Sequence, residues 1–124
     1  MVKWLNLIVG GVTGTVARYV LAGAVYQVLG ASFPYGTLVV NLTGCFAIGF
    51  LAALAEEKLL LSPEARMLWM VGFCGAFTTF STFMLETANL MKDGEMAKAF
   101  VNVAASVVIG FVVFRLGMLV ANRL

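Results

Sequence analysis

The sequence contains no histidine and very little charge. Without an imidazole the chain has no histidine metal ligand, no histidine general base and no histidine proton relay. Charged residues make up 11% of its 124 residues, against roughly 25% in a soluble domain. Too few polar side chains remain to cover a soluble fold, so the lipid bilayer must serve as part of the solvent.

Net charge and cysteine are also low. A net charge of +2 is too small to indicate nucleic acid or an acidic substrate as a partner. The two cysteines, Cys45 and Cys74, both lie in apolar runs, which favours small buried side chains over a disulfide or a metal pair. What the chain has instead is apolar side chains, with 62% hydrophobic residues and a mean hydropathy of +1.02.

Four apolar stretches are long enough to cross a bilayer as helices, which takes about 20 residues each. They cover roughly residues 4–29, 35–55, 67–91 and 97–121. The connections between them are short and leave no room for a soluble domain. We therefore expect an all-α integral membrane protein, with one four-helix transmembrane domain over residues 1–124 in a multi-pass arrangement in the cell membrane.

The loop charges bear on how the chain inserts. Four spans put both termini and the 56–66 loop on one side of the membrane. That side carries four basic residues, Lys3, Lys58, Arg66 and Arg123. The opposite side carries two, Lys92 and Lys98. This bias is slight, so it leaves open insertion in both orientations and an antiparallel homodimer. Four helices fill their own centre with side chains, so transport would favour an oligomer.

Three polar residues lie inside the spans, where polar side chains are costly and usually functional. Arg18, far from either end of the first span, indicates an anchor near a water-filled vestibule, with snorkelling as the alternative. Asn41 shares a helix face with Thr37, and its amide donors can replace water around an anion or bond a neighbouring helix. Glu86, the only acid inside an apolar segment, could pair with a basic group, tune access to a path, or snorkel.

The third span contains the run 72–83, in which two glycines precede a segment rich in hydroxyl and phenylalanine residues. Such a segment is a poor helix, and a broken helix survives in a membrane only where its freed backbone groups meet protein, water or ions. Freed carbonyls suit a hard cation. Beyond the break, Phe80 and Phe83 share a face with Ser81 and Thr82 between them, and ring edges carry partial positive charge. This lining would tolerate a small anion.

Three motifs in this order together resemble the small fluoride channels called Fluc or CrcB, over the whole chain. The motifs are Gly10-x3-Gly14-x3-Arg18, Gly36-Thr37-Leu38-Val39-Val40-Asn41-x2-Gly44, and the run 72–83. The resemblance implies an antiparallel dual-topology homodimer in a prokaryotic inner membrane, with two fluoride pores and one central structural sodium ion. It implies passive export of fluoride that protects the cell, without enzymatic activity, an organic cofactor or nucleic acid.

The resemblance also implies roles for individual residues. Backbone carbonyls of Gly75 and Thr78 from both subunits would hold the sodium ion. The fluoride pore would be lined by Asn41, by Phe80 and Phe83 from opposite subunits, and by Thr37, Ser81 and Thr82. Arg18 matches the family's basic residue at the vestibule, and Glu86 matches an acid near the pore end.

The fourth span departs from the family pattern. Gly110 and Phe114 stand where the family carries hydroxyls, which leaves Ser106 and Asn102 as its uncharged polar residues. A small multidrug transporter shares the size and span number, but it needs a glutamate in the first helix, where this chain offers Arg18. A non-transporting assembly protein would leave the hydroxyl and aromatic face of the third span unexplained.

Overall fold

The computed structural model describes residues 1–124 as helices joined by short turns, without strands. The elements are α1 (Val2–Leu29), α2 (Tyr35–Ala52), η1 (Ala53–Glu57), α3 (Pro63–Ala65), η2 (Arg66–Cys74), α4 (Gly75–Phe77), α5 (Phe80–Lys92) and α6 (Met96–Asn122). They build four rods long and apolar enough to cross a membrane, Val2–Leu29, Tyr35–Glu57, Pro63–Lys92 and Met96–Asn122. The four predicted spans are therefore confirmed, each with slightly different ends.

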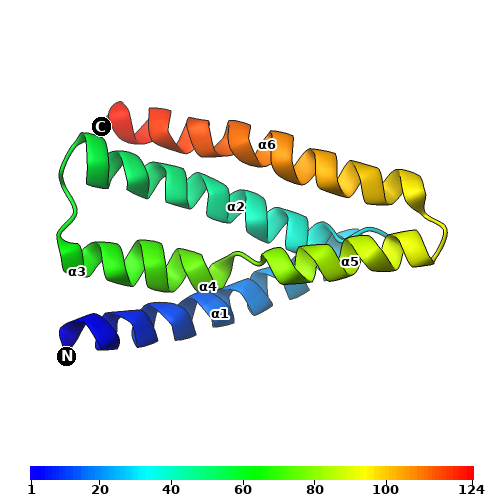
Figure 1. Ribbon diagram of the computed structural model, residues 1–124, viewed down its shortest axis with the longest axis horizontal. Helices are drawn as coiled ribbons and strands as arrows, with labels where there is room; N and C mark the ends of the chain where they lie inside the picture. The colour runs from blue at the N-terminus through cyan, green and yellow to red at the C-terminus, as the bar shows by residue number, and fades with distance from the viewer.

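The four rods alternate in direction (Figure 1). Both termini and the turn between η1 and α3 lie at one end, as the count of spans predicts. α2 packs most extensively against α6, and α1 packs against η2. These contacts bring backbones together: a Cβ on Gly49 or Gly117 would overlap a carbonyl oxygen of the partner helix, and so would one on Gly10 or Gly14. Small residues at such contacts are typical of membrane helices.

The third rod is broken at two residues. Thr78 (φ −86°, ψ 157°) and Thr79 (φ −147°, ψ 111°) are extended, whereas Gly75 keeps helical angles (φ −62°, ψ −35°). Thr79 then caps the second half, because its hydroxyl accepts a hydrogen bond from the backbone N–H of Thr82 at 3.3 Å. The predicted interruption is confirmed, and it is narrower than the 72–83 run.

A nine-residue π-helix, η2, precedes the break. The π-helix is a wider helix with i→i+5 hydrogen bonds that is rare and often found at functional sites. The sequence has no pattern that predicts it. It carries Gly72, which lies against Gly10 of α1 so closely that a Cβ on Gly72 would stand 3.1 Å from the Gly10 Cα. The first half of the third span therefore follows α1 at backbone distance.

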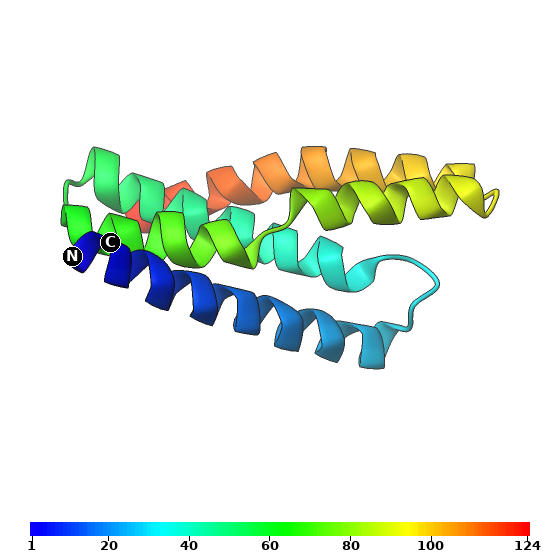
Figure 2. The ribbon, with the colours of Figure 1, turned by 60° about the horizontal axis from the view of Figure 1, so that its bottom comes forward.

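The break changes the neighbour of the third span. Before it, η2 and α4 contact α1; after it, α5 packs mainly against α6. Figure 2 shows the connecting segment as a short extended link between the two helical halves. The redirection leaves part of α5 uncovered, with Phe80 73% exposed.

Candidate functional site

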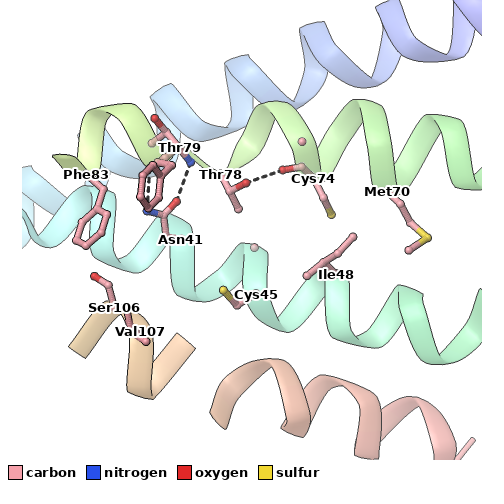
Figure 3. Close-up of a pocket in the computed structure, with 13 residues that line it drawn as sticks. Asn41, Cys45, Ile48, Met70, Cys74, Thr78, Thr79, Phe83, Ser106 and Val107 are labelled. Carbon is pink, nitrogen blue, oxygen red and sulfur yellow. Dashed lines mark hydrogen bonds between the residues drawn. The ribbon is translucent and has the colours of Figure 1, made fainter. Parts of the chain in front are cut away.

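A cavity of about 420 Å³ lies beside the break, between the third span and the helices α2 and α6 (Figure 3). Five residues predicted to meet ions line it. They are Asn41, Gly75, Thr78, Phe80 and Phe83. The chain therefore brings residues from two distant motifs, 36–44 and 72–83, to one place.

Asn41 holds the broken segment from the side of α2. Its Oδ1 accepts a hydrogen bond from the Thr79 N–H at 2.8 Å, and its Nδ2 donates to the Thr79 carbonyl at 3.1 Å. Since an amide carries two N–H donors, one donor stays free for another partner. Of the two alternatives that the sequence allows for Asn41, the structure shows the bond to a neighbouring helix. The second amide N–H remains free beside the cavity.

Gly44 makes room for this approach. A Cβ on Gly44 would overlap the Cγ2 of Thr78 and lie 3.3 Å from the ring of Phe77. Any larger residue would therefore push the broken segment away from α2. The Gly44 position is three residues beyond Asn41, so both face the break from one side of the helix.

The carbonyl groups at the break differ in their partners. The Cys74 carbonyl accepts from the Thr78 N–H at 3.1 Å and from the Thr78 hydroxyl at 3.0 Å. The Ala76 carbonyl accepts from Nε of Arg18 at 3.0 Å. None of the hydrogen bonds made at the break goes to the carbonyls of Gly75 or Thr78. Both residues line the cavity.

Arg18 reaches the third span rather than the membrane surface. Its guanidinium is part-buried and bonds the Ala76 carbonyl near the end of the first half. Cations at helix C-termini stabilise the unpaired carbonyls there. Arg18 therefore anchors α1 to the third span through this hydrogen bond. Its location at a vestibule stays a prediction.

The two phenylalanines lie together but differ in exposure. Their ring centroids are 5.8 Å apart with an interplanar angle of 65°, an edge-to-face contact. Phe83 is 6% exposed, whereas Phe80 is 73% exposed. The Phe83 ring is therefore packed within the chain, and the Phe80 ring is exposed beside the cavity.

A buried hydrogen-bond chain supports Phe83 from the fourth span. Asn102, 2% exposed, donates to the Thr87 hydroxyl at 2.9 Å, and that hydroxyl donates to the Phe83 carbonyl at 2.8 Å. One turn further along α6, Ser106 lines the cavity, and its buried Oγ has no hydrogen-bond partner. The fourth span thus contributes a free hydroxyl, which the sequence analysis left unassigned.

The other predicted residues lie outside this cavity. Thr37 is buried on α2, Ser81 is exposed, and the Thr82 hydroxyl lies 2.9 Å from that of Thr79. Glu86 lines a second cavity of about 520 Å³ near the opposite end from the termini. Within the chain its partner is not a basic group: Oε2 accepts from the Tyr26 hydroxyl at 3.1 Å.

Both cysteines are free thiols on the wall of the first cavity. Figure 3 shows Cys45 on α2 and Cys74 at the end of η2, on separate helices. Cys74 is buried, as expected of an apolar cysteine, and Cys45 is half-buried.

Four apolar rods, a broken third span and a cavity at the break together define a multi-pass helical membrane protein. The family model described as "CrcB-like protein, Camphor Resistance (CrcB)" matches residues 5–118. The chain belongs to this family, as its motifs predict.

The chain is similar to several bacterial proteins, each named "Fluoride-specific ion channel FluC". The protein of Geobacter sulfurreducens is 46% identical over 100% of both chains. That of Magnetococcus marinus is 47% identical over 98% of this chain and 97% of its own. The protein of Chlorobaculum tepidum is 52% identical over 91% of this chain and 89% of its own. Together with the four spans, these relatives make the chain a multi-pass protein of a prokaryotic cell membrane.

Proposed function

We propose that the protein is a fluoride-selective channel that lets fluoride leave the cytoplasm passively and so protects the cell from it. The observation that carries this proposal is the cavity, where a free amide donor of Asn41 and a free hydroxyl of Ser106 lie beside the buried ring of Phe83, with the exposed ring of Phe80 at the edge. The printed names of the relatives support fluoride as the ion.

The chemistry of these donors suits a small, strongly hydrated anion. An ion in a pore needs groups that replace its water and still let it leave. One amide, one hydroxyl and ring edges with partial positive charge are weak donors, and none is a cation that would hold the anion firmly. Arg18 and its charge are tied to the Ala76 carbonyl, so the pore wall itself stays uncharged.

A structural sodium ion would fit the two free carbonyls of Gly75 and Thr78. Both oxygens come from neutral backbone groups, which suits a hard monovalent cation. Two oxygens from one chain are too few to surround an ion, so a second subunit would supply the others. Bound there, sodium would neutralise the carbonyl dipoles that the break leaves unpaired.

The exposed ring of Phe80 supports an antiparallel homodimer with two pores. Phe80, 73% exposed beside the open cavity, would reach the pore of a second copy, and the second copy's ring would reach this one. The slight bias of basic loop residues permits insertion in both orientations. Each subunit then lines two pores, one with Phe83 and one with Phe80.

The test of this function is ion efflux from liposomes that contain the purified protein. Vesicles loaded with fluoride or with chloride are diluted into buffer without that anion, and release is followed with ion-selective electrodes. We expect fast loss of fluoride and retention of chloride. Equal leakage of both anions, or release of neither, would contradict the assignment.

A further inference from the structure

The second cavity contains a tyrosine and a carboxylate that the proposed conduction site does not use. The Tyr26 hydroxyl of α1 donates to Glu86 Oε2 at 3.1 Å, and both residues line this cavity of about 520 Å³. The other carboxylate oxygen, Oε1, is buried and has no hydrogen-bond partner in the chain. Tyr26 is therefore the one side chain that holds this acid.

The fold makes a place for the tyrosine ring. A Cβ on Gly36 would stand 2.8 Å from Cδ2 of Tyr26 and 2.8 Å from the Ala22 carbonyl. The absence of a side chain at this point of α2 leaves room for the ring beside the helix. Since the ring is held by backbone, the hydroxyl has a defined position towards α5.

No cation neutralises Glu86. The ion pair of the chain joins Lys98 to Glu95 at 3.7 Å, and Lys98 also donates to the Ser32 carbonyl at 3.2 Å. Lys98 lines the same cavity, but its partners are these two groups. Asp93 and Glu95 add further negative charge to the wall, so the acidic residues outnumber the single lysine there.

Glu86 lies three residues beyond Phe83 on α5, so the two share one face of this helix. An anion that passes Phe83 towards this end of the molecule would come near the carboxylate, and like charges at short distance repel strongly where the surroundings are apolar. The position of the carboxylate, and not only its charge, then decides how fast an anion passes.

We propose that Tyr26 is a positioning residue that holds the Glu86 carboxylate against α1, out of the path of fluoride. The inference rests on the proposed channel function. Removal of the hydroxyl frees the carboxylate to swing into the path, so conduction falls although no group of the first cavity has changed.

The experiment compares fluoride efflux of Tyr26→Phe, Glu86→Gln and the double variant in liposomes. We expect Tyr26→Phe to slow efflux about tenfold, since hydrogen bonds to charged groups are the stronger ones. In the Glu86→Gln background the same change alters the rate less than about twofold, because no charge remains to position. Tyr19→Phe is the matched control, since Tyr19 lies on the same helix and is 81% exposed. We expect the fluoride efflux rate of this variant to equal that of wild type.

A second readout follows the carboxylate itself by infrared difference spectroscopy, with the Glu86→Gln protein as reference. The Glu86 band shifts in Tyr26→Phe if the hydroxyl holds it. An unchanged band, an unchanged efflux rate in Tyr26→Phe, or an equal loss in the Glu86→Gln background would overturn the inference. Absence of fluoride efflux from wild-type protein would instead contradict the channel function.

Discussion

The two halves of the third span carry different groups and rest on different neighbours. The first half, η2 and α4, lies against α1, where Gly10 and Gly14 admit its backbone, and it ends in carbonyl oxygens. The second half, α5, packs mainly against α6 and begins with phenylalanines and hydroxyls. Only two extended residues, Thr78 and Thr79, separate them.

The two ends of the break fit the two ions proposed for this protein, which have opposite charge. A helix ends in unpaired carbonyls and begins with unpaired N–H groups, so a break places partial negative charge before it and partial positive charge after it. A cation is favoured at the first half and an anion at the second. Asn41 fixes the border by bonding both backbone groups of Thr79.

The largest expected effect is therefore that of Asn41→Ala. The change leaves the N–H and the carbonyl of Thr79 without partners, and each such group costs about 1–3 kcal/mol. We expect the free energy of unfolding to fall by about 3 kcal/mol, together with fluoride conduction. Denaturant unfolding in micelles measures the first quantity. Thr43→Val is the control, since the Thr43 hydroxyl bonds only the Val39 carbonyl of its own helix; an equal loss in both variants would contradict the bracing role.

Phe80→Ile tests the role of the second half of the third span, α5, by itself. Loss of the ring edge should slow fluoride efflux about 100-fold, equivalent to about 2.7 kcal/mol of barrier, while the dimer still assembles. Efflux from liposomes and size-exclusion chromatography give the two readouts. Phe100→Ile serves as control, because Phe100 is 74% exposed at the start of α6. Similar rates in the two variants would show that the ring of Phe80 takes no part in conduction.

Gly44→Ala tests how closely the break must approach α2. The added methyl would overlap the Cγ2 of Thr78, so we expect a loss of about 2 kcal/mol in stability, as overpacking costs about 1–3 kcal/mol. Gly110→Ala adds the same methyl where the nearest atom, Cys45 Sγ, is 3.5 Å away. Thermal unfolding should leave Gly110→Ala near wild type, and a reversed order of the two would refute this packing argument.

The smallest effect expected is that of Asn102→Leu. The change removes the donor to Thr87 and leaves the bond from Thr87 to the Phe83 carbonyl. Hydrogen bonds between membrane helices average about 0.6 kcal/mol in double-mutant cycles, so we expect a loss near that value. A double-mutant cycle with Thr87→Val measures the coupling energy between Asn102 and Thr87. Additive losses of stability would mean that these hydrogen bonds do not act as a unit.

The sequence predicted the four spans and the broken third one because both depend on local properties. Apolar length decides what crosses a bilayer, and glycines followed by hydroxyl residues form a weak helix wherever they stand.

The partners across helices could not be predicted. Spacing shows which residues share a face of one helix, but it does not show which residue of another helix lies opposite. The bond from Tyr26 to Glu86, the clamp of Asn41 on Thr79 and the free hydroxyl of Ser106 all depend on this relation. The π-helical course of η2 also has no local signal, because the same residues can make i→i+4 bonds.

The division of the third span into a cation half and an anion half is tested most directly by the cation dependence of dimer stability, measured in wild type and in Phe80→Ile. We expect sodium to raise the unfolding midpoint of both proteins equally relative to potassium, since a bound ion stabilises only the folded state and its site lies before the break. Fluoride conduction is lost only in Phe80→Ile. A wild-type midpoint that is the same in sodium and potassium, or a sodium effect that disappears in Phe80→Ile, would contradict the division.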